Sequence, residues 1–273
     1  MKAENFYPLA LTRPVDELIC GAATIGAKKR SHPVEHIWDL IKYLGQDLEE
    51  DIKDGKMERW KDGKRGTVHS TVVILNEKNV LIEEGAEIEP YAVLDARQGP
   101  IYIGKKTIIK PHAYLRGPLY IGPECRIGGE VSDSIFHGYS NKAHYGFIGH
   151  SYIGQWVNLG AGTTCSNLKN TYGTVKVNGI DTGTQFLGCF VGDHAKTGIG
   201  TLINTGTVIG VGANVLGGSV TPKNIPNFTW KGKEKYKLDK FLEVAAAVMK
   251  RRGVELSAKE IETLKKVYKQ AQL

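Results

Sequence analysis

The 273-residue sequence lacks the features that mark several classes of protein. Its four cysteines form no C-x-x-C pair and are too few for a disulfide scaffold in a chain of this length, which favours a reducing compartment. No apolar run approaches the roughly 18 residues that span a bilayer, and the opening Met-Lys-Ala-Glu-Asn has no apolar core of a signal peptide. We therefore expect a cytoplasmic protein with no membrane partner.

Aromatic residues are also scarce, at 8%, whereas glycine is abundant, and 25 of the 33 glycines fall between residues 67 and 228. In this stretch a small apolar residue or threonine returns at every sixth position. Examples are Ile103, Ile109, Leu115, Ile121 and Ile127, and the period resumes from Val191 to Thr221. A period of six fits neither a helix nor sustained alternation, but it fits a solenoid in which each hexad makes one short strand and one corner. A glycine-rich sandwich, with strands every 8–12 residues, is the disfavoured alternative.

The two flanks of the solenoid differ from it and from each other. Apolar residues follow helical spacing between Ser31 and Ile52, with Pro33 suited to the first turn, which predicts one amphipathic helix. Residues 53–66 have no apolar period and are predicted to be a solvated linker. The domains expected are thus a helical segment and linker at 1–66, the solenoid at 67–228, and a helical tail at 229–273.

The tail should contain two helices. Leu238 to Met249 form a helical apolar stripe, and Ser257 and Glu260 form a capping-box pattern before a second stripe. Residues 229–273 contain 12 basic and 6 acidic residues, so they carry +6 of the net charge of +7. Because this charge falls on the outer faces of terminal helices, we interpret it as solvated surface and expect no nucleic-acid partner.

The stretch from Ala143 to Cys165 combines a histidine, His144, with a repeat unit and the run Asn158-Leu-Gly-Ala-Gly. At this spacing it resembles the acetyltransferase half of the bifunctional uridyltransferase/glucosamine-1-phosphate acetyltransferases. The resemblance implies an all-β solenoid that is a left-handed parallel β-helix of hexapeptide repeats, with flanking α-helices. It also implies an acetyl-CoA-dependent acyltransferase acting on a sugar, sugar phosphate or nucleotide sugar, and a homotrimer with its sites between subunits.

A second resemblance lies at the N-terminus, where Asn5 to Pro14 and Glu17 to Gly21 are similar to the opening of a sugar nucleotidyltransferase domain. That domain needs a doubly wound sheet of about 150–250 residues, whereas only about 65 residues precede the first hexad. We therefore interpret residues 1–66 as a remnant of that domain or as a cap on the end of the solenoid.

The family resemblance assigns roles to individual residues. It implies that His144 is the general base, because the attacking amine or hydroxyl must lose a proton, and that Asn158 and Arg116 hold the acceptor. The other acceptor-binding candidates are Asn141, Lys142, Phe147, Lys169 and Lys176. Two departures from the family pattern disfavour a sugar 1-phosphate: the second phosphate-binding lysine falls near Ser132 or Asp133, and a substrate-contacting tyrosine is Phe147.

The cofactor contacts implied by the resemblance are Asp193, Lys196 and Gly210. The backbone at Asp193 would face the thioester oxygen of acetyl-CoA. A carboxylate beside a developing oxyanion is unfavourable unless it is paired. We expect Lys196 to be its partner.

Two other functions stay open. The chain could be a nucleotidyltransferase-family member with lost or residual activity that acts as a binding module. A zinc enzyme resembling the trimeric carbonic anhydrases is disfavoured, because that family uses an H-x4-H pair and this chain has H-x5-H at His144 and His150. Three ligands must meet within about 2.1 Å of one zinc ion, and one inserted residue redirects a strand side chain. No metal is therefore expected in the β-helix.

Overall fold

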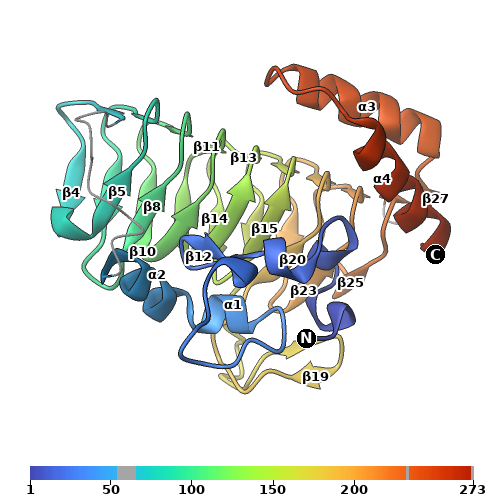
Figure 1. The fold of residues 1–273 in the computed structure, drawn as a ribbon, viewed down its shortest axis with the longest axis horizontal. Coiled ribbons are helices and arrows are strands. Elements are labelled where there is room, and N and C mark those ends of the chain that lie inside the picture. The colour runs from blue at the N-terminus through green and yellow to red at the C-terminus, as the bar shows by residue number, and fades with distance from the viewer. Residues whose placement is uncertain (54–65, 232–233, 272–273) are drawn as a thin grey trace.

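A stack of short parallel strands forms the body of the protein, with helical segments along one flank and over one end (Figure 1). This computed structural model describes residues 1–53, 66–231 and 234–271, so most of the predicted linker lies outside the described residues. The strands pair coil to coil in parallel register. The predicted fold class, a left-handed parallel β-helix with flanking helices, is confirmed.

The coils present three faces. Face A consists of β4 Val73–Leu75, β7 Val93–Asp95, the first halves of β10 Tyr114–Ile121 and β12 Glu130–Gly138, β14 Phe147–Gly149, β17 Thr164–Cys165 and β22 Leu202–Ile203. Face B consists of β5 Val80–Ile82, β8 Ile101–Ile103, the second halves of β10 and β12, β15 Tyr152–Gln155, β20 Cys189–Val191, β23 Thr207–Ile209 and β25 Asn224–Ile225. Face C consists of β3 Thr67–Val68, β6 Glu87–Ile88, β9 Ile108–Ile109, β11 Arg126–Ile127, β13 Asn141–Lys142, β16 Asn158–Leu159, β21 Lys196–Thr197, β24 Asn214–Val215 and β26 Thr229–Trp230, followed by antiparallel β27 Glu234–Lys235.

Aliphatic side chains at the hexad positions fill the inside of the coils, with Phe136 among them. Glycine is needed here mainly because it has no side chain, which lets successive coils approach closely. A Cβ added at Gly122 would collide with the backbone carbonyl of His137 in the next coil, and one at Gly210 would collide with Asn227. Several corners instead place other residues at positive φ, for example His112 at 58° and His150 at 50°. The glycine-rich composition therefore reflects close approach of successive coils.

The N-terminal segment covers face B, so the prediction that it caps an end of the solenoid is wrong (Figure 1). The outward side chains of face B are apolar and buried, as at Leu81, Tyr120 and Tyr152, and they share one cluster with Phe6 and Leu44. An uncovered apolar sheet face of this kind would be costly in water. The segment therefore completes the fold along the flank of the stack.

The single helix that the sequence predicted from Ser31 to Ile52 is instead two shorter helices that begin at Asp39. Helix α1 is Asp39–Lys42 and α2 is Leu44–Lys53. Asp39 Oδ2 accepts hydrogen bonds of 2.9 Å from the backbone nitrogens of Glu35 and His36, which holds a turn where the helix was expected to begin. The short elements before it are η1 Ala3–Phe6, η2 Leu9–Leu11, η3 Val15–Glu17, β1 Ile19–Cys20, β2 Ala23–Thr24 and η4 Ile25–Ala27.

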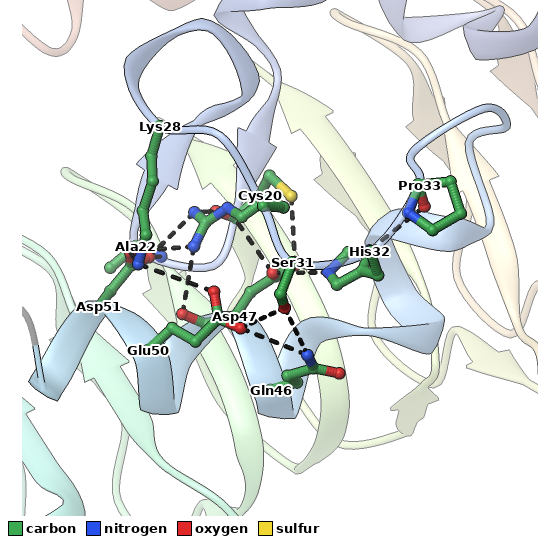
Figure 2. A network of polar contacts seen from close by, with 11 residues as sticks. Cys20, Ala22, Lys28, Ser31, His32, Pro33, Gln46, Asp47, Glu50 and Asp51 are labelled. Carbon is green, nitrogen blue, oxygen red and sulfur yellow. Dashed lines mark hydrogen bonds and ion pairs between the residues drawn. The ribbon is translucent and has the colours of Figure 1, made fainter.

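Buried ion pairs hold the N-terminal segment together (Figure 2). Asp47 and Asp51 of α2 have no exposed surface. Asp51 Oδ1 lies 2.9 Å from Arg30 Nη1, and Asp51 Oδ2 accepts from the backbone nitrogen of Ala22 at 2.8 Å. His32 Nε2 lies 2.8 Å from Asp47 Oδ1. Because each buried carboxylate has several partners, residues 19–51 form a defined unit on face B.

Both predicted C-terminal helices are confirmed. They are α3 Leu238–Lys250 and α4 Ala258–Gln270, and the capping box of Ser257 and Glu260 is formed in full. Phe241 and Leu264 pack with Phe228 over the last coils. Within the described residues, every helix is too short or too polar to span a bilayer.

Candidate functional site

A groove of about 700 Å³ lies between face A and the loop at residues 166–187. Of the described residues that line it, none is acidic, and two are the lysines Lys169 and Lys223. Lys169 Nζ donates to the carbonyl of Thr174 at 2.8 Å, and Lys223 Nζ donates to Thr205 Oγ1 at 3.1 Å and to the Thr205 carbonyl. Burial and the charge of Lys169 both lower the pKa of Lys223. Two ammonium groups with neutral oxygen partners make this groove suited to phosphate.

The predicted residues Phe147 and Lys169 both line this groove, whereas Lys176 does not. Lys176 lies in a small hairpin of β18 Lys176–Val177 and β19 Ile180–Asp181. The loop at residues 166–187 is packed against another part of the chain. Val175, Val177 and Leu187 are buried in the same cluster as the N-terminal segment. The loop is anchored by that contact and presents its other side to face A.

A row of polar residues follows the edge between faces A and B. Arg116 Nη2 lies 3.1 Å from Asp133 Oδ2, and His150 Nε2 lies 3.8 Å from Asp133 Oδ1. His150 Nδ1 lies 2.9 Å from the side-chain nitrogen of Asn167. Burial lowers the pKa of His150, so this side chain is uncharged near neutral pH. The charge of Arg116 is balanced by Asp133.

Sequence reasoning identified Arg116 in this row but missed His150 and Asn167, and also missed Lys223 in the groove. A signal for the row was present. Arg116, Asp133, His150 and Asn167 follow one another at intervals of 17 residues, which is one coil. Side chains one coil apart stack on the same edge of a solenoid. Counting by coils would therefore have placed these four residues together.

His144 is exposed on the turn that leads from β13 of face C to β14 of face A. Lys142, two residues earlier, points the other way. Its side chain lies inside the coils with 1% of the residue exposed, and Nζ donates to the carbonyls of Gly128 at 2.8 Å and His144 at 2.7 Å. Burial lowers its pKa to about 8. The prediction that Lys142 contacts substrate is wrong, because its ammonium group is inside the solenoid.

The other predicted acceptor residues lie on face C. Asn141 and Asn158 are register partners there, and Asn158 is in turn aligned with Lys196. Asn141 Oδ1 accepts from Arg252 Nη2 at 2.9 Å, and its amide lies 3.4 Å from Asn158 Oδ1. These residues point away from the face A groove. Within one chain, Asn141 and Asn158 are therefore on a different face from the groove that Phe147 and Lys169 line.

Asp193 has a partner that the sequence did not reveal. Its carboxylate forms a salt bridge with Arg13 and accepts from Thr12 Oγ1 at 2.6 Å and from the Gln155 nitrogen at 2.7 Å. The predicted pairing with Lys196 is wrong, since Lys196 Nζ donates to the carbonyl of His194 at 3.1 Å. Burial alone would raise the pKa of Asp193, but the Arg13 charge and the Thr12 hydrogen bond keep it below its usual value. Asp193 thus docks the N-terminal segment.

His194, which is buried, and His137, which is half-buried, should make the protein sensitive to acid. Burial lowers the pKa of His137 to about 3 and that of His194 to about 4. In the unfolded chain a histidine binds a proton below about pH 6.5, whereas these two stay neutral in the folded protein. The free energy of unfolding is therefore highest above that pH and decreases as the pH drops toward 4. Each histidine contributes a slope of about 1.4 kcal/mol per pH unit in that window.

The test is thermal unfolding between pH 7.5 and 5, with His194→Phe as the comparison. We expect the melting temperature to fall with decreasing pH, and to fall less steeply in the variant. A melting temperature that is constant over this range would contradict the burial of these histidines as neutral groups.

No three His, Cys, Asp or Glu side chains of residues 1–53, 66–231 and 234–271 gather closely enough to hold a metal ion. His112 instead stacks on Tyr91, with ring centroids 5.2 Å apart. His137 Nδ1 lies 2.9 Å from Tyr152 Oη.

Sequence comparisons identify relatives of the solenoid. The chain is 37% identical over 166 residues to a bifunctional sugar-1-phosphate nucleotidylyltransferase/acetyltransferase of Sulfurisphaera tokodaii, covering 59% of this chain and 40% of that protein. It is 29% identical over 165 residues to the bifunctional protein GlmU of a Picosynechococcus species, covering 55% of this chain and 33% of that protein. The chain therefore spans less than half the length of these curated relatives.

No family model matches the chain. Among solved structures, AntD, an N-acyltransferase from Bacillus cereus in complex with dTDP and 3-hydroxybutyryl-CoA, aligns with a TM-score of 0.31 and 16% identity, covering 75% of this chain and 96% of that one. The sequence matches confirm the resemblance predicted from Ala143 to Cys165. The chain is a sequence relative of the bifunctional sugar-1-phosphate nucleotidylyltransferase/acetyltransferases.

Proposed function

We propose that the protein is an acyltransferase that moves an acetyl group from acetyl-CoA to a sugar or nucleotide sugar. The observation that carries the proposal is the placement of His144. It is exposed on a turn three residues before Phe147, which lines the groove with Lys169 and Lys223. The relatives named as acetyltransferases support the same reaction class.

In this proposal His144 takes the proton of the acceptor amine or hydroxyl as its nitrogen or oxygen attacks the thioester carbonyl. The C–S bond then breaks, and the protonated His144 returns the proton to the leaving thiolate of CoA. Lys169 and Lys223 hold phosphate groups of CoA, since they provide ammonium donors in a groove whose described lining contains no acidic residue. Contacts of CoA with Lys196 and with the backbones of Asp193 and Gly210 stay predictions.

The acceptor carries no phosphate at the edge occupied by Arg116. The Arg116–Asp133 pair has no net charge, and the adjacent His150 is neutral. A phosphate dianion placed there would face the Asp133 carboxylate, whereas a hydroxyl or amine could donate to it. This favours an amino sugar or nucleotide sugar over a sugar 1-phosphate.

We further propose that the active assembly is a cytoplasmic homotrimer. Asn141 and Asn158 on face C can join the groove only if face C of one subunit lies opposite face A of another. The edge between these two faces exposes large apolar side chains, with Tyr145 71% and Ile199 75% exposed. Burial of such side chains between subunits would stabilise the assembly.

The test is release of free CoA from acetyl-CoA in the presence of a panel of amino sugars and nucleotide sugars. We expect turnover with at least one member of the panel and little with sugar 1-phosphates. Absence of CoA release with every acceptor, together with tight binding of a nucleotide sugar, would instead support the binding-module alternative. Pyrophosphate exchange with UTP or dTTP would show nucleotidyltransferase activity, which we do not expect.

A further inference from the structure

One inward position of face C carries a lysine where the neighbouring coils carry aliphatic residues. By strand register, the inward residues of successive coils of face C are Ile109, Ile127, Lys142 and Leu159. The three aliphatic side chains are at most 2% exposed, and Lys142 is 1% exposed. Removing an ammonium group from water is costly unless it is well hydrogen-bonded. Packing alone therefore does not explain a lysine at this position.

The turn in the preceding coil explains how the ammonium group fits. Between β11 and β12 the chain turns with only Gly128 and Gly129, whereas the turns after β9, β13 and β16 each contain four residues. The short turn leaves space that Lys142 Nζ fills, and a Cβ added at Gly129 would lie 2.8 Å from Nζ. Lys142 is thus matched to a shortened turn directly beside the His144 turn.

The hydrogen bonds of Lys142 tie these two turns together. Nζ donates to the carbonyl of Gly128 in one coil and to the carbonyl of His144 in the next. Backbone bonds also join turns on this edge, as from the His112 nitrogen to the Pro90 carbonyl at 3.2 Å and from the Gly162 nitrogen to the Tyr145 carbonyl at 3.0 Å, but the His144 carbonyl itself is held by Lys142. The peptide that carries the His144 side chain is therefore fixed from inside the solenoid by a side chain.

We infer that Lys142 is a positioning residue that fixes the direction in which His144 is presented to the reacting groups. The inference rests on the proposed role of His144 as general base. Lys142 does not touch the substrate. Its two hydrogen bonds limit movement of the His144 peptide, and small displacements of a base lower the rate of proton transfer strongly.

The test variant is Lys142→Met, which keeps the length of the side chain and removes its donors. Removal of the donors leaves the Gly128 and His144 carbonyls without this partner, but it also removes a buried charge, so we expect a folded protein with a modestly lower melting temperature. We expect kcat for CoA release to fall at least tenfold while KM for acetyl-CoA changes less than twofold. The matched control is Ile127→Met, one coil earlier in the same inward row, which should leave kcat unchanged.

A second variant, Lys142→Gln, keeps donors on a shorter side chain and should recover part of the lost kcat. If the methionine variant does not fold, Lys142→Leu takes its place, because leucine also lacks donors. Wild-type kcat in a folded Lys142→Met or Lys142→Leu protein would overturn the inference, and so would a folded Lys142→Gln protein that is no more active than these variants. Failure of the proposed function is recognised separately, because the wild type would then release no CoA with any acceptor, or His144→Ala would retain full turnover.

Discussion

Replacement of His144 by alanine should lower the rate of CoA release by a factor of about 10²–10⁴, the range typical for loss of a general base. The side chain is exposed on its turn. Its removal should therefore leave the fold and the melting temperature unchanged, so the loss reports on chemistry. The measurement is kcat with the best acceptor of the panel, together with circular dichroism of the variant.

His112 provides the matched control for this experiment. It lies on the same edge of the solenoid, on the turn between β9 and β10, and it is exposed like His144. His112→Ala should retain the full rate, because this histidine is not beside the groove residue Phe147. Equal turnover of His144→Ala and wild type would refute the assignment of the base.

Removal of Arg13 should destabilise the protein by about 3–5 kcal/mol, because it leaves a buried carboxylate without its cation. The side chain of Asp193 is only 4% exposed and that of Arg13 only 8%. Arg13 belongs to the N-terminal segment and Asp193 to a coil corner, so the variant should also loosen the cover of face B. Urea unfolding of Arg13→Ala measures the first effect, and protection of residues 1–53 from hydrogen exchange measures the second.

An exposed ion pair of the same chain serves as the control. Lys240 Nζ lies 2.7 Å from Glu243 Oε2, and the two side chains are 68% and 66% exposed. Because exposed pairs contribute at most about 1 kcal/mol, Lys240→Ala should have a small effect. A double variant, Arg13→Met with Asp193→Asn, should recover much of the stability lost in Arg13→Ala. If Arg13→Ala and Lys240→Ala were equally stable, the buried pair would not hold the segment.

The repeat made the coils predictable because one requirement, an inward aliphatic residue, recurs at a fixed interval. The placement of the N-terminal segment was harder, although a signal for it exists. Strands of face B are apolar at the outward position too, as in Leu119-Tyr120-Ile121, whereas those of face C alternate, as in Arg126-Ile127. Strands that are apolar on both sides are buried on both sides, so one face needed a cover.

Other features could not be predicted because they depend on contacts between distant segments. Arg13 and Asp193 are 180 residues apart, and the pattern around neither residue indicates the other. The Lys142 side chain points inward because the preceding turn, between β11 and β12, is two residues shorter than the turns of the neighbouring coils. This shorter turn also shifts the six-residue period at that point. The local sequence pattern therefore predicted the fold class and the position of His144. It did not predict the partners of Asp193 and Lys142.

The most direct test of the proposed site is a crystal structure of the protein with acetyl-CoA and an acceptor bound. We expect phosphate groups of the coenzyme at Lys169 and Lys223, and the thioester within reach of the His144 imidazole. Coenzyme bound elsewhere, for instance in the cleft of about 800 Å³ lined by Lys2, Lys29 and His36, with His144 distant from the thioester, would contradict it.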